Sequence, residues 1–304
     1  MEKQRRIDAY GVCRVGDRVL LARSPAADGL AGRWQLPGGP VGHAEDPAAT
    51  VLRGITGSTA GSAGFDVEVT GLRAVVSDVV ALPAAGVALH VDRIVYDLGP
   101  RAGSPAPPDG PGWAPVAGLP DLPLAPFTAE VLGLPPAAFT APAPAGGRPA
   151  APAAPAADRM QRFGAYGLVT DPAGRVLLAQ IADGYPGAGE WHLPGGGTDH
   201  GEQPAAGLLR EIAEETGQAG RVTGLLAVAH RHLPGALGPE GRPIDFHVVG
   251  ALYRVAVDEP AELAVAEAAG GSTAGVAWLP PAEAATRRLS YIAGIALARL
   301  ERRE

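Results

Sequence analysis

The chain of 304 residues is long for one domain and suits two domains of about 150 residues, each large enough to bury a core. Gly at 43 residues and Pro at 31 are frequent, but a hydrophobic content of 46% excludes a disordered chain and assigns the excess to loops and linkers. The net charge of -7 argues against a nucleic-acid partner, because polyanions bind basic surfaces.

The ends and the cysteine usage point to an ordinary intracellular chain. Its N-terminus reads MEKQRR and continues into a strand-like segment, without the apolar core of a signal peptide. No run approaches the roughly 20 apolar residues that span a bilayer. Cys13 is the single cysteine, which excludes an intrachain disulfide and a thiolate metal cluster. We expect a soluble cytoplasmic protein with neither a membrane nor a nucleic acid as its partner.

The predicted elements occur twice in the same order, which is the mark of an internal repeat with a long period. AYGVCRVGDRVLLAR, from Ala9, and AYGLVTDPAGRVLLAQ, from Ala165, each predict a β-hairpin, because two apolar runs flank a turn. GRWQLPGGP and GEWHLPGGG follow, then a helical segment, two longer strands and a tryptophan before a proline. Each copy ends in a predicted helix, over residues 128–134 and 289–302.

The repeat predicts two domains, residues 1–134 and 160–304, in which strands and one central helix alternate without regular βαβ spacing. That pattern favours an α/β arrangement with a mixed sheet flanked by helices. Residues 135–159 are so rich in proline that the backbone lacks the donors and angles that helix or sheet needs, and we interpret them as a semi-extended linker. A docking motif is the alternative interpretation of this segment.

A helix predicted over residues 203–216 carries the chemistry of the second copy. An apolar stripe at helical spacing and a helix-ending glycine, Gly217, support it. Glu211, Glu214 and Glu215 stand at i, i+3 and i+4, so they share one face. Their repulsion costs a few tenths of a kcal/mol per pair, and a hard dication such as Mg²⁺ would offset it. A solvated glutamate-rich helix is the alternative.

Further residues at fixed offsets favour the metal site. The stretch GGTDHGEQPAAGLLREIAEETGQ, from Gly196 to Gln218, resembles the Nudix box. In that family a loop-helix-loop binds divalent metal and hydrolyses nucleoside diphosphates linked to other moieties. The resemblance implies two tandem Nudix-like α/β/α sandwich domains with mixed β-sheets, and Mg²⁺ as the cofactor with Mn²⁺ as an alternative. Gln218 departs from the family, which usually has an aliphatic residue there.

The resemblance also implies roles by position. Glu211 and Glu215 are the principal metal ligands, Glu214 is a third ligand or a base, and the Gly196 carbonyl is a further ligand. Arg210 orients a glutamate through charge-assisted hydrogen bonds, and Glu202 holds Arg210. Around Gly196, the neighbouring glycines let the backbone approach the phosphates; these are Gly195 and Gly197. The general base often lies outside the box, and the candidates are Glu262 and Glu267.

The first copy keeps only part of this pattern. Gly39, Glu45 and Arg53 stand at the matching offsets, but glycine or serine replaces the three glutamates. The replacing residues are Gly54, Gly57 and Ser58, with Ala60 at the place of the late glycine. We expect this half to be catalytically inactive. It could serve dimerisation, cover the second site, sense a ligand, or be a structural remnant of duplication.

Residues after the box are candidates for choosing the substrate. His230 and His232 share one face of a predicted strand, and His247 lies on the next, so the three imidazoles could line a phosphate or sugar pocket. Scattered histidines are the alternative. Trp191, Tyr185 and Phe246 are candidates for base stacking, with core packing as the alternative.

The substrate class remains open between several readings. Pro234 lies about where Nudix proteins that resemble ADP-ribose hydrolases have a proline, so ADP-ribose or a nucleotide sugar is favoured. A modified nucleoside triphosphate is the alternative. A nucleotide-sensing protein without turnover is a second hypothesis, and a purely structural protein a third. A homodimer is compatible with each of them.

Overall fold

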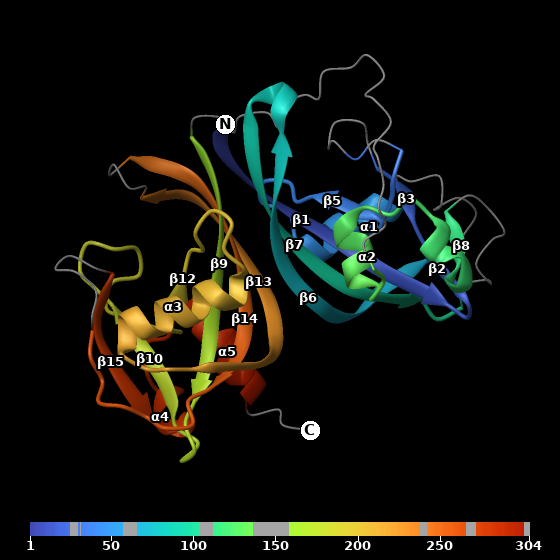
Figure 1. The fold of residues 1–304 in the computed structure, drawn as a ribbon. Helices are drawn as coiled ribbons and strands as arrows, with labels where there is room; N and C mark the ends of the chain where they lie inside the picture. The colour runs from blue at the N-terminus through green and yellow to red at the C-terminus, as the bar shows by residue number, and fades with distance from the viewer. Residues whose placement is uncertain are drawn as a thin grey trace. The chain divides into compact units, whose positions relative to one another are not determined.

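The computed structural model describes residues 1–24, 30, 32–56, 66–103, 112–135, 158–237, 242–265 and 272–300 (Figure 1). The chain divides into two compact units, Met1–Ala154 and Pro155–Glu304. Most of the linker expected at 135–159 lies outside the described residues. None of the helices in the described part combines the length and apolar character that crossing a bilayer needs.

The first unit is built on a mixed sheet with the strand order β6-β7-β1-β2-β8, and β5 pairs with β1. β1 and β7 run parallel, and the other neighbours are antiparallel. Its strands are β1 (Glu2–Val15), β2 (Arg18–Leu20), β3 (Ala22–Arg23), β4 (Trp34–Gln35), β5 (Gly38–Pro40), β6 (Val67–Leu82), β7 (Val87–Pro100) and β8 (Trp113–Pro115). Its helices are α1 (Pro47–Thr56), α2 (Pro126–Val131) and the 3-10 turns Pro83–Ala85 and Val116–Asp121.

The second unit has a sheet with the order β11-β10-β9-β14-β13, in which β12 pairs with β9 and β15 with β10. Again one pair, β9 and β14, is parallel. The strands are β9 (Arg159–Thr170), β10 (Val176–Ile181), β11 (Trp191–His192), β12 (Gly195–Gly196), β13 (Arg221–Leu237), β14 (Pro243–Ala256) and β15 (Thr273–Leu279). The helices are α3 (Pro204–Thr216), α4 (Pro281–Ala284) and α5 (Tyr291–Leu300).

The hairpin predicted in each copy is confirmed, and its turn has a local cause. In the second unit, the Asp171 carboxylate accepts hydrogen bonds from the Arg175 backbone N–H at 2.8 Å and from its guanidinium at 2.7 Å. Gly174 takes a positive φ of 75°, which closes the turn without strain. These contacts fix the turn between β9 and β10. β9 itself runs through the middle of the sheet and pairs with β12 of the glycine loop.

Helices cover both faces of the second sheet (Figure 1). Ile212 of α3 lies over Gly167, and Ile292 of α5 lies over Gly250 on the opposite face. Leu208 and Ile212 are fully buried, and burial of each such side chain contributes about 1.5–3 kcal/mol. Packing of this apolar stripe therefore fixes which face of α3 turns away from the sheet.

The termini of the helices agree closely with the predictions. α3 begins with Pro204 and ends at Gly217, whose N–H donates to the Ala213 carbonyl at 3.0 Å and whose φ is 72°. α5 starts two residues later than predicted, because the Ser290 hydroxyl accepts the N–H of Ala293 and caps the first turn. The helix predicted at 128–134 is observed as Pro126–Val131 and is followed by Gly133, with a φ of 70°.

The two units repeat the same strand pairings, residue for residue. Tyr10 lies opposite Gly38 in the first sheet, and Tyr166 lies opposite Gly195 in the second. Trp113 faces Leu20 across β2 and β8, as Trp278 faces Leu177 across β10 and β15. The repeat seen in the sequence is therefore also a repeat of topology and register.

Candidate active site

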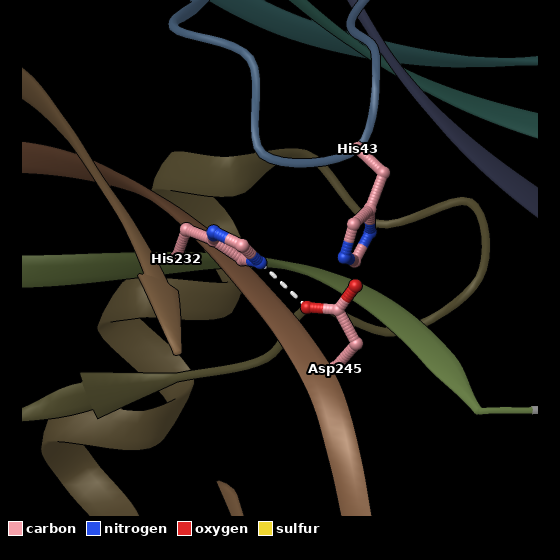
Figure 2. A group of neighbouring side chains, drawn as sticks. All are labelled: His43, His232 and Asp245. Carbon is pink, nitrogen blue, oxygen red and sulfur yellow. Dashed lines mark hydrogen bonds and ion pairs between the residues drawn. The ribbon is translucent and has the colours of Figure 1, made fainter. Parts of the chain in front are cut away.

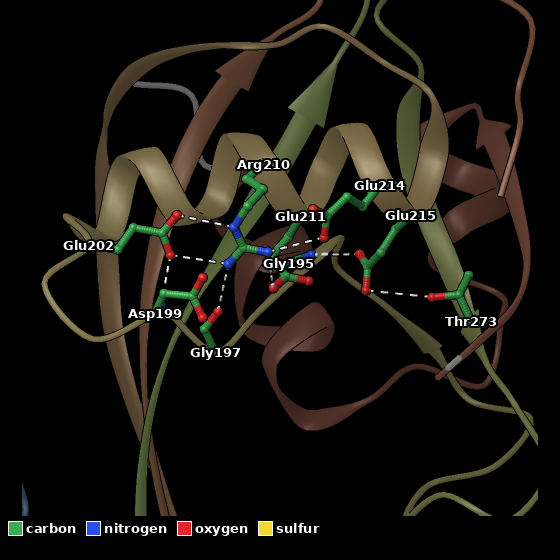
Figure 3. A network of polar contacts seen from close by, with 9 residues as sticks. All are labelled: Gly195, Gly197, Asp199, Glu202, Arg210, Glu211, Glu214, Glu215 and Thr273. Atoms are coloured by element: carbon green, nitrogen blue, oxygen red, sulfur yellow. Dashed lines mark hydrogen bonds and ion pairs between the residues drawn. The ribbon is translucent and has the colours of Figure 1, made fainter. Parts of the chain in front are cut away.

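Three glutamates of α3 form the centre of the site (Figure 3). The side chain of Glu211 is 19% exposed and that of Glu214 is 52% exposed, whereas Glu215 is buried at 6%. Glu215 thus sits deepest and Glu214 reaches solvent. This gradient distinguishes the three carboxylates, which the sequence spacing alone could not do.

The buried carboxylate of Glu215 is held by the glycine loop. The Gly195 N–H donates to its Oε2 at 2.8 Å, and the Thr273 hydroxyl lies 3.5 Å from its Oε1. Gly195 has a φ of 125°, and a Cβ there would lie 2.3 Å from the Ala165 carbonyl oxygen. Only glycine fits this position. The contact therefore places an ionisable group beside the backbone of β12.

Arg210 ties the other carboxylates together. Its Nε and Nη2 both donate to Glu202 at 3.1 Å, while Nη1 donates to Glu211 at 2.9 Å and to Glu214 at 3.1 Å. The hydrogen bonds to Glu202 and Glu211 raise the pKa of Arg210 above its usual range. Glu202 is in turn fixed by the Asp199 N–H at 2.8 Å. The structure thus brings Arg210 into contact with Glu202, Glu211 and Glu214, and the roles expected of these residues stay predictions.

Oxygen atoms converge on the Gly195–Gly196 backbone. A Cβ placed on Gly196 would lie 3.2 Å from Glu211 Oε2, so no side chain separates this backbone from the carboxylate. Glu215 reaches the same segment through Gly195. Two carboxylates and the Gly196 carbonyl offer the hard oxygen donors that Mg²⁺ prefers, so the residues present fit a divalent cation. Gly197 contributes its carbonyl oxygen, which lies 3.5 Å from Arg210 Nη2.

Two neighbouring cavities share part of their walls, and Glu215 lines the smaller one. The smaller has a volume of about 240 Å³ and is lined by Gly195, Gly196, Glu215 and Arg162, among others. The larger, of about 460 Å³, lies between β13, β14, β11 and the start of α5. Both are bounded by the same four residues, namely Tyr166, Ile181, Pro186 and His192. A ligand could therefore extend from the carboxylates into the larger cavity.

His192 stands in the wall that the two cavities share. Its Nδ1 lies 2.7 Å from the Ser290 hydroxyl, and its ring meets the Tyr166 ring edge-on at 4.9 Å between centroids. Burial lowers the pKa of His192 to about 4 and raises the pKa of Tyr166. Both side chains are consequently neutral near pH 7 and act there as hydrogen-bonding or stacking groups.

The histidines expected to choose the substrate lie in different surroundings. β13 and β14 are adjacent as expected, and His230 lines the larger cavity together with Arg231 and Phe246. His247, by contrast, is fully buried, with Gln161 Nε2 at 3.0 Å from its Nδ1. His232 Nε2 lies 2.5 Å from Asp245 Oδ1 (Figure 2). Neither His232 nor His247 lines the two cavities described above.

The remaining candidates are also placed. Tyr185 lines the smaller cavity, whereas Trp191 packs against the hydrophobic core. Glu262 is exposed, and Glu267 lies outside the described residues. Pro234 is exposed within β13.

The Gln218 side chain is buried and makes hydrogen bonds of its own. Its side chain accepts from the Ala261 N–H at 2.9 Å and donates to the Ala261 carbonyl at 3.1 Å. The departure from the family pattern therefore supplies two hydrogen bonds that an aliphatic residue could not make.

The matching place in the first unit lacks the carboxylates. Arg53 donates to Glu45 at 2.7 and 2.9 Å, which lowers the pKa of Glu45 to about 2. Gly54 stands where Glu211 stands in α3, and a Cβ there would lie 2.8 Å from the Gly38 Cα. α1 therefore packs too closely on β5 for a side chain at this position. The other two positions, Gly57 and Ser58, and Ala60 lie outside the described residues.

Arg162 is a residue of the smaller cavity that the sequence reasoning missed. It lies in the strand segment MQRF, which has no motif and reads as an ordinary solvated strand position. The pairing of β9 with β12 brings it beside the glycine loop. Only that pairing could have identified it.

The family model of the NUDIX domain matches residues 160–299. An RNA pyrophosphohydrolase from Acidiphilium cryptum (strain JF-5) is 52% identical over 46 residues, which span 15% of this chain and only 28% of that relative.

Solved structures similar to this chain include a MutT protein from Methanosarcina mazei Go1, with 19% identity and a TM-score of 0.39, over 48% of this chain and 97% of that one. A MutT NUDIX hydrolase from Burkholderia pseudomallei has 27% identity and a TM-score of 0.38, over 46% of this chain and 98% of that one.

The second unit therefore contains the NUDIX domain match, which spans residues 160–299. The carboxylate helix, the Arg210 network and the glycine loop all lie inside it.

Proposed function

We propose that the second unit hydrolyses the pyrophosphate bond of a nucleoside diphosphate linked to another group, with Mg²⁺ as the cofactor. The observation that carries the proposal is the meeting of Glu211 and Glu215 with the Gly195–Gly196 backbone at the edge of a two-part cavity. The relative from Acidiphilium cryptum is named a pyrophosphohydrolase, which supports the same class of reaction.

Each residue of the site has a part in this mechanism. Glu211, Glu215 and the Gly196 carbonyl would hold the metal, which supplies polarisation of the phosphoryl oxygens and of the attacking water. Arg210 holds Glu211 in one orientation through a bond of 2.9 Å. Glu214, the most exposed carboxylate, is the third ligand or the group that accepts the proton of the attacking water. Glu262 is the candidate base outside the box.

The cavities support a substrate with two large parts joined by a diphosphate. The larger cavity, at about 460 Å³, is within the size range of small-molecule sites and offers the faces of Phe246 and Tyr291 to a nucleobase. His230 and Arg231 add polar groups to its lining. We favour ADP-ribose or a nucleotide sugar, and a modified nucleoside triphosphate is the alternative. We assign no substrate contact to His232 or His247.

The first unit is, in this proposal, a degenerate Nudix-like copy without catalysis. Its strand register matches that of the second unit, and Gly54 leaves no carboxylate where Glu211 stands. A divalent cation would lack that ligand there.

A phosphate-release screen with Mg²⁺ tests the proposed reaction. Wild type, Glu214→Gln and Glu215→Gln would be assayed on ADP-ribose, nucleotide sugars, dinucleoside polyphosphates and modified triphosphates, with phosphatase added to release phosphate from monoesters. Glu283→Gln is the matched control, because Glu283 is a helical glutamate paired with Arg287 at 2.7 Å, away from the cavities.

Turnover of one substrate class by wild type and Glu283→Gln, with a loss of at least about 100-fold in Glu215→Gln, would support the proposal. Rates in Glu214→Gln and Glu215→Gln equal to wild type would refute the assignment of the site. Binding of a nucleotide without product across the panel would instead favour a sensing protein.

A further inference from the structure

Arg162 extends from β9 into the lining of the smaller cavity, beside the carboxylate helix. It shares that lining with Gly195, Gly196 and Glu215. A Cβ placed on Gly197 would lie 3.0 Å from Arg162 Nη2, so the guanidinium lies directly against the glycine loop. Within the described part of the chain, no carboxylate forms an ion pair with it. A permanent positive charge thus borders the cavity without an ion pair to a described carboxylate.

The first unit has an arginine at the equivalent position, and there a carboxylate neutralises its charge. Because Tyr10 pairs with Gly38 as Tyr166 pairs with Gly195, Arg6 occupies the place of Arg162. Arg6 donates to both oxygens of Asp8, at 2.7 and 2.8 Å. Asp8 is fully buried and also accepts from the Tyr10 hydroxyl at 3.0 Å. In this unit a carboxylate of the chain itself fills the anion position.

The second unit cannot supply that carboxylate, since Gly164 stands where Asp8 stands. A Cβ on Gly164 would lie 2.8 Å from the Tyr166 hydroxyl and 3.0 Å from the Gly196 carbonyl oxygen. The two units also differ in the volume of the cavity that this arginine lines. The cavity that Arg6 lines in the first unit, together with Arg93 and Phe127, has a volume of about 10 Å³, whereas the cavity beside Arg162 has about 240 Å³. Arg162 therefore borders open space, whereas Arg6 is neutralised by Asp8 and borders almost none.

We propose that Arg162 binds the diphosphate of the substrate in the smaller cavity. The diphosphate would lie beside Arg162 as the Asp8 carboxylate lies beside Arg6. The planar guanidinium fits two phosphate oxygens at once, as it fits the two oxygens of Asp8 in the first unit. Glu211 and Glu215 would face the same diphosphate through the metal. This inference rests on the proposed function and adds the residue that recognises the anion.

Titration with inorganic pyrophosphate in the presence of Mg²⁺, followed by calorimetry on the full chain, tests the inference without turnover. Arg162→Gln is expected to weaken binding about 10- to 100-fold, because one charge-assisted bidentate contact is lost. Arg162→Lys should bind with intermediate affinity, since a lysine keeps the charge and loses the fork. Arg159→Gln is the control, because Arg159 lies in the same strand and pairs with Asp245 at 3.6 Å.

A second variant places a carboxylate beside the arginine. Gly164→Asp should weaken pyrophosphate binding more than Gly164→Ala, since both introduce a Cβ but only aspartate neutralises Arg162. Unchanged melting curves for Arg162→Gln, whose side chain is exposed, would confirm that the fold is intact.

The outcomes separate this inference from the proposed reaction. Wild-type pyrophosphate affinity in Arg162→Gln, or no binding by wild type, would overturn the role of Arg162. If wild type hydrolyses a substrate and Glu215→Gln does not, while Arg162→Gln retains the wild-type KM, only the inference fails. If no substrate is hydrolysed but Arg162→Gln loses pyrophosphate, the anion site stands and the proposed hydrolysis fails.

Discussion

Replacement of Arg210 by methionine should destabilise the second unit more than the matched change destabilises the first. Arg210→Met keeps an unbranched apolar stem and removes four hydrogen bonds to carboxylates, two to Glu202 and one each to Glu211 and Glu214. Arg53→Met removes two bonds to Glu45 at the equivalent place. Each variant also loses one contact to a backbone carbonyl, that of Pro40 for Arg53 and that of Gly197 for Arg210. The pair of variants therefore isolates what the additional carboxylates contribute.

The magnitudes follow from exposure and charge. Arg53 is 60% exposed, so its ion pair with Glu45 should contribute about 1 kcal/mol or less. The side chains of Glu202 and Glu211 are only 18% and 19% exposed, and loss of Arg210 also leaves like charges at helical spacing, at about 0.2–0.5 kcal/mol per pair. We expect a loss of about 2–3 kcal/mol for Arg210→Met without added metal.

Urea unfolding followed by tryptophan fluorescence can measure each unit separately. Trp34 and Trp113 belong to the first unit, and Trp191 and Trp278 to the second. Phenylalanine in place of one pair leaves fluorescence that reports on the other unit. Equal losses in the two units would refute the reasoning, because they would show that Arg210 does no more than pair with Glu202.

Two further predictions concern the wall and the loop of the site. Gly195→Ala should lower the melting temperature and abolish metal-induced stabilisation, because its Cβ would lie 2.3 Å from the Ala165 carbonyl oxygen, whereas a Cβ at Gly196 meets only the Glu211 side chain at 3.2 Å. Calorimetry of both alanine variants checks this, and equal melting temperatures would contradict it. His192→Gln should reduce the loss of stability in acid. The folded pKa of His192, about 4, lies below its ordinary value of 6.5, so stability falls as the pH drops from about 6.5 to 4, by up to about 3 kcal/mol. Urea unfolding between pH 4 and 7 measures the difference, and identical acid profiles for wild type and variant would exclude this contribution.

Local sequence patterns were enough to predict the helix of the box correctly. The stripe of Leu208 and Ile212 and the stop at Gly217 define α3 almost to the residue, because helical periodicity and a glycine cap are local signals. The grouping of Glu211, Glu214 and Glu215 on one face follows from the same periodicity. Their different burial does not, since it depends on the β12 loop packed against the helix.

Features of the site that depend on pairing between distant strands could not be predicted from the sequence. Arg162 joins the site only because β9 pairs with β12, and His232 and His247 lie away from the cavities because of where β13 and β14 run in the sheet. Strand adjacency was predicted correctly for these histidines, but the face that borders the cavity was not. Sequence alternation divides a strand into two faces without saying which one a ligand meets.

Two copies of one topology in a single chain create a problem of folding fidelity. Tethered repeats can exchange equivalent strands while they fold, and β1 and β9 occupy equivalent positions in sheets of equal register. A β1 strand in the second sheet would bring Asp8 to the position of Gly164, where a Cβ would lie 3.0 Å from the Gly196 carbonyl oxygen. We therefore expect the side chain that neutralises Arg6 to disfavour this exchange as well, because it would crowd the glycine loop of the second unit.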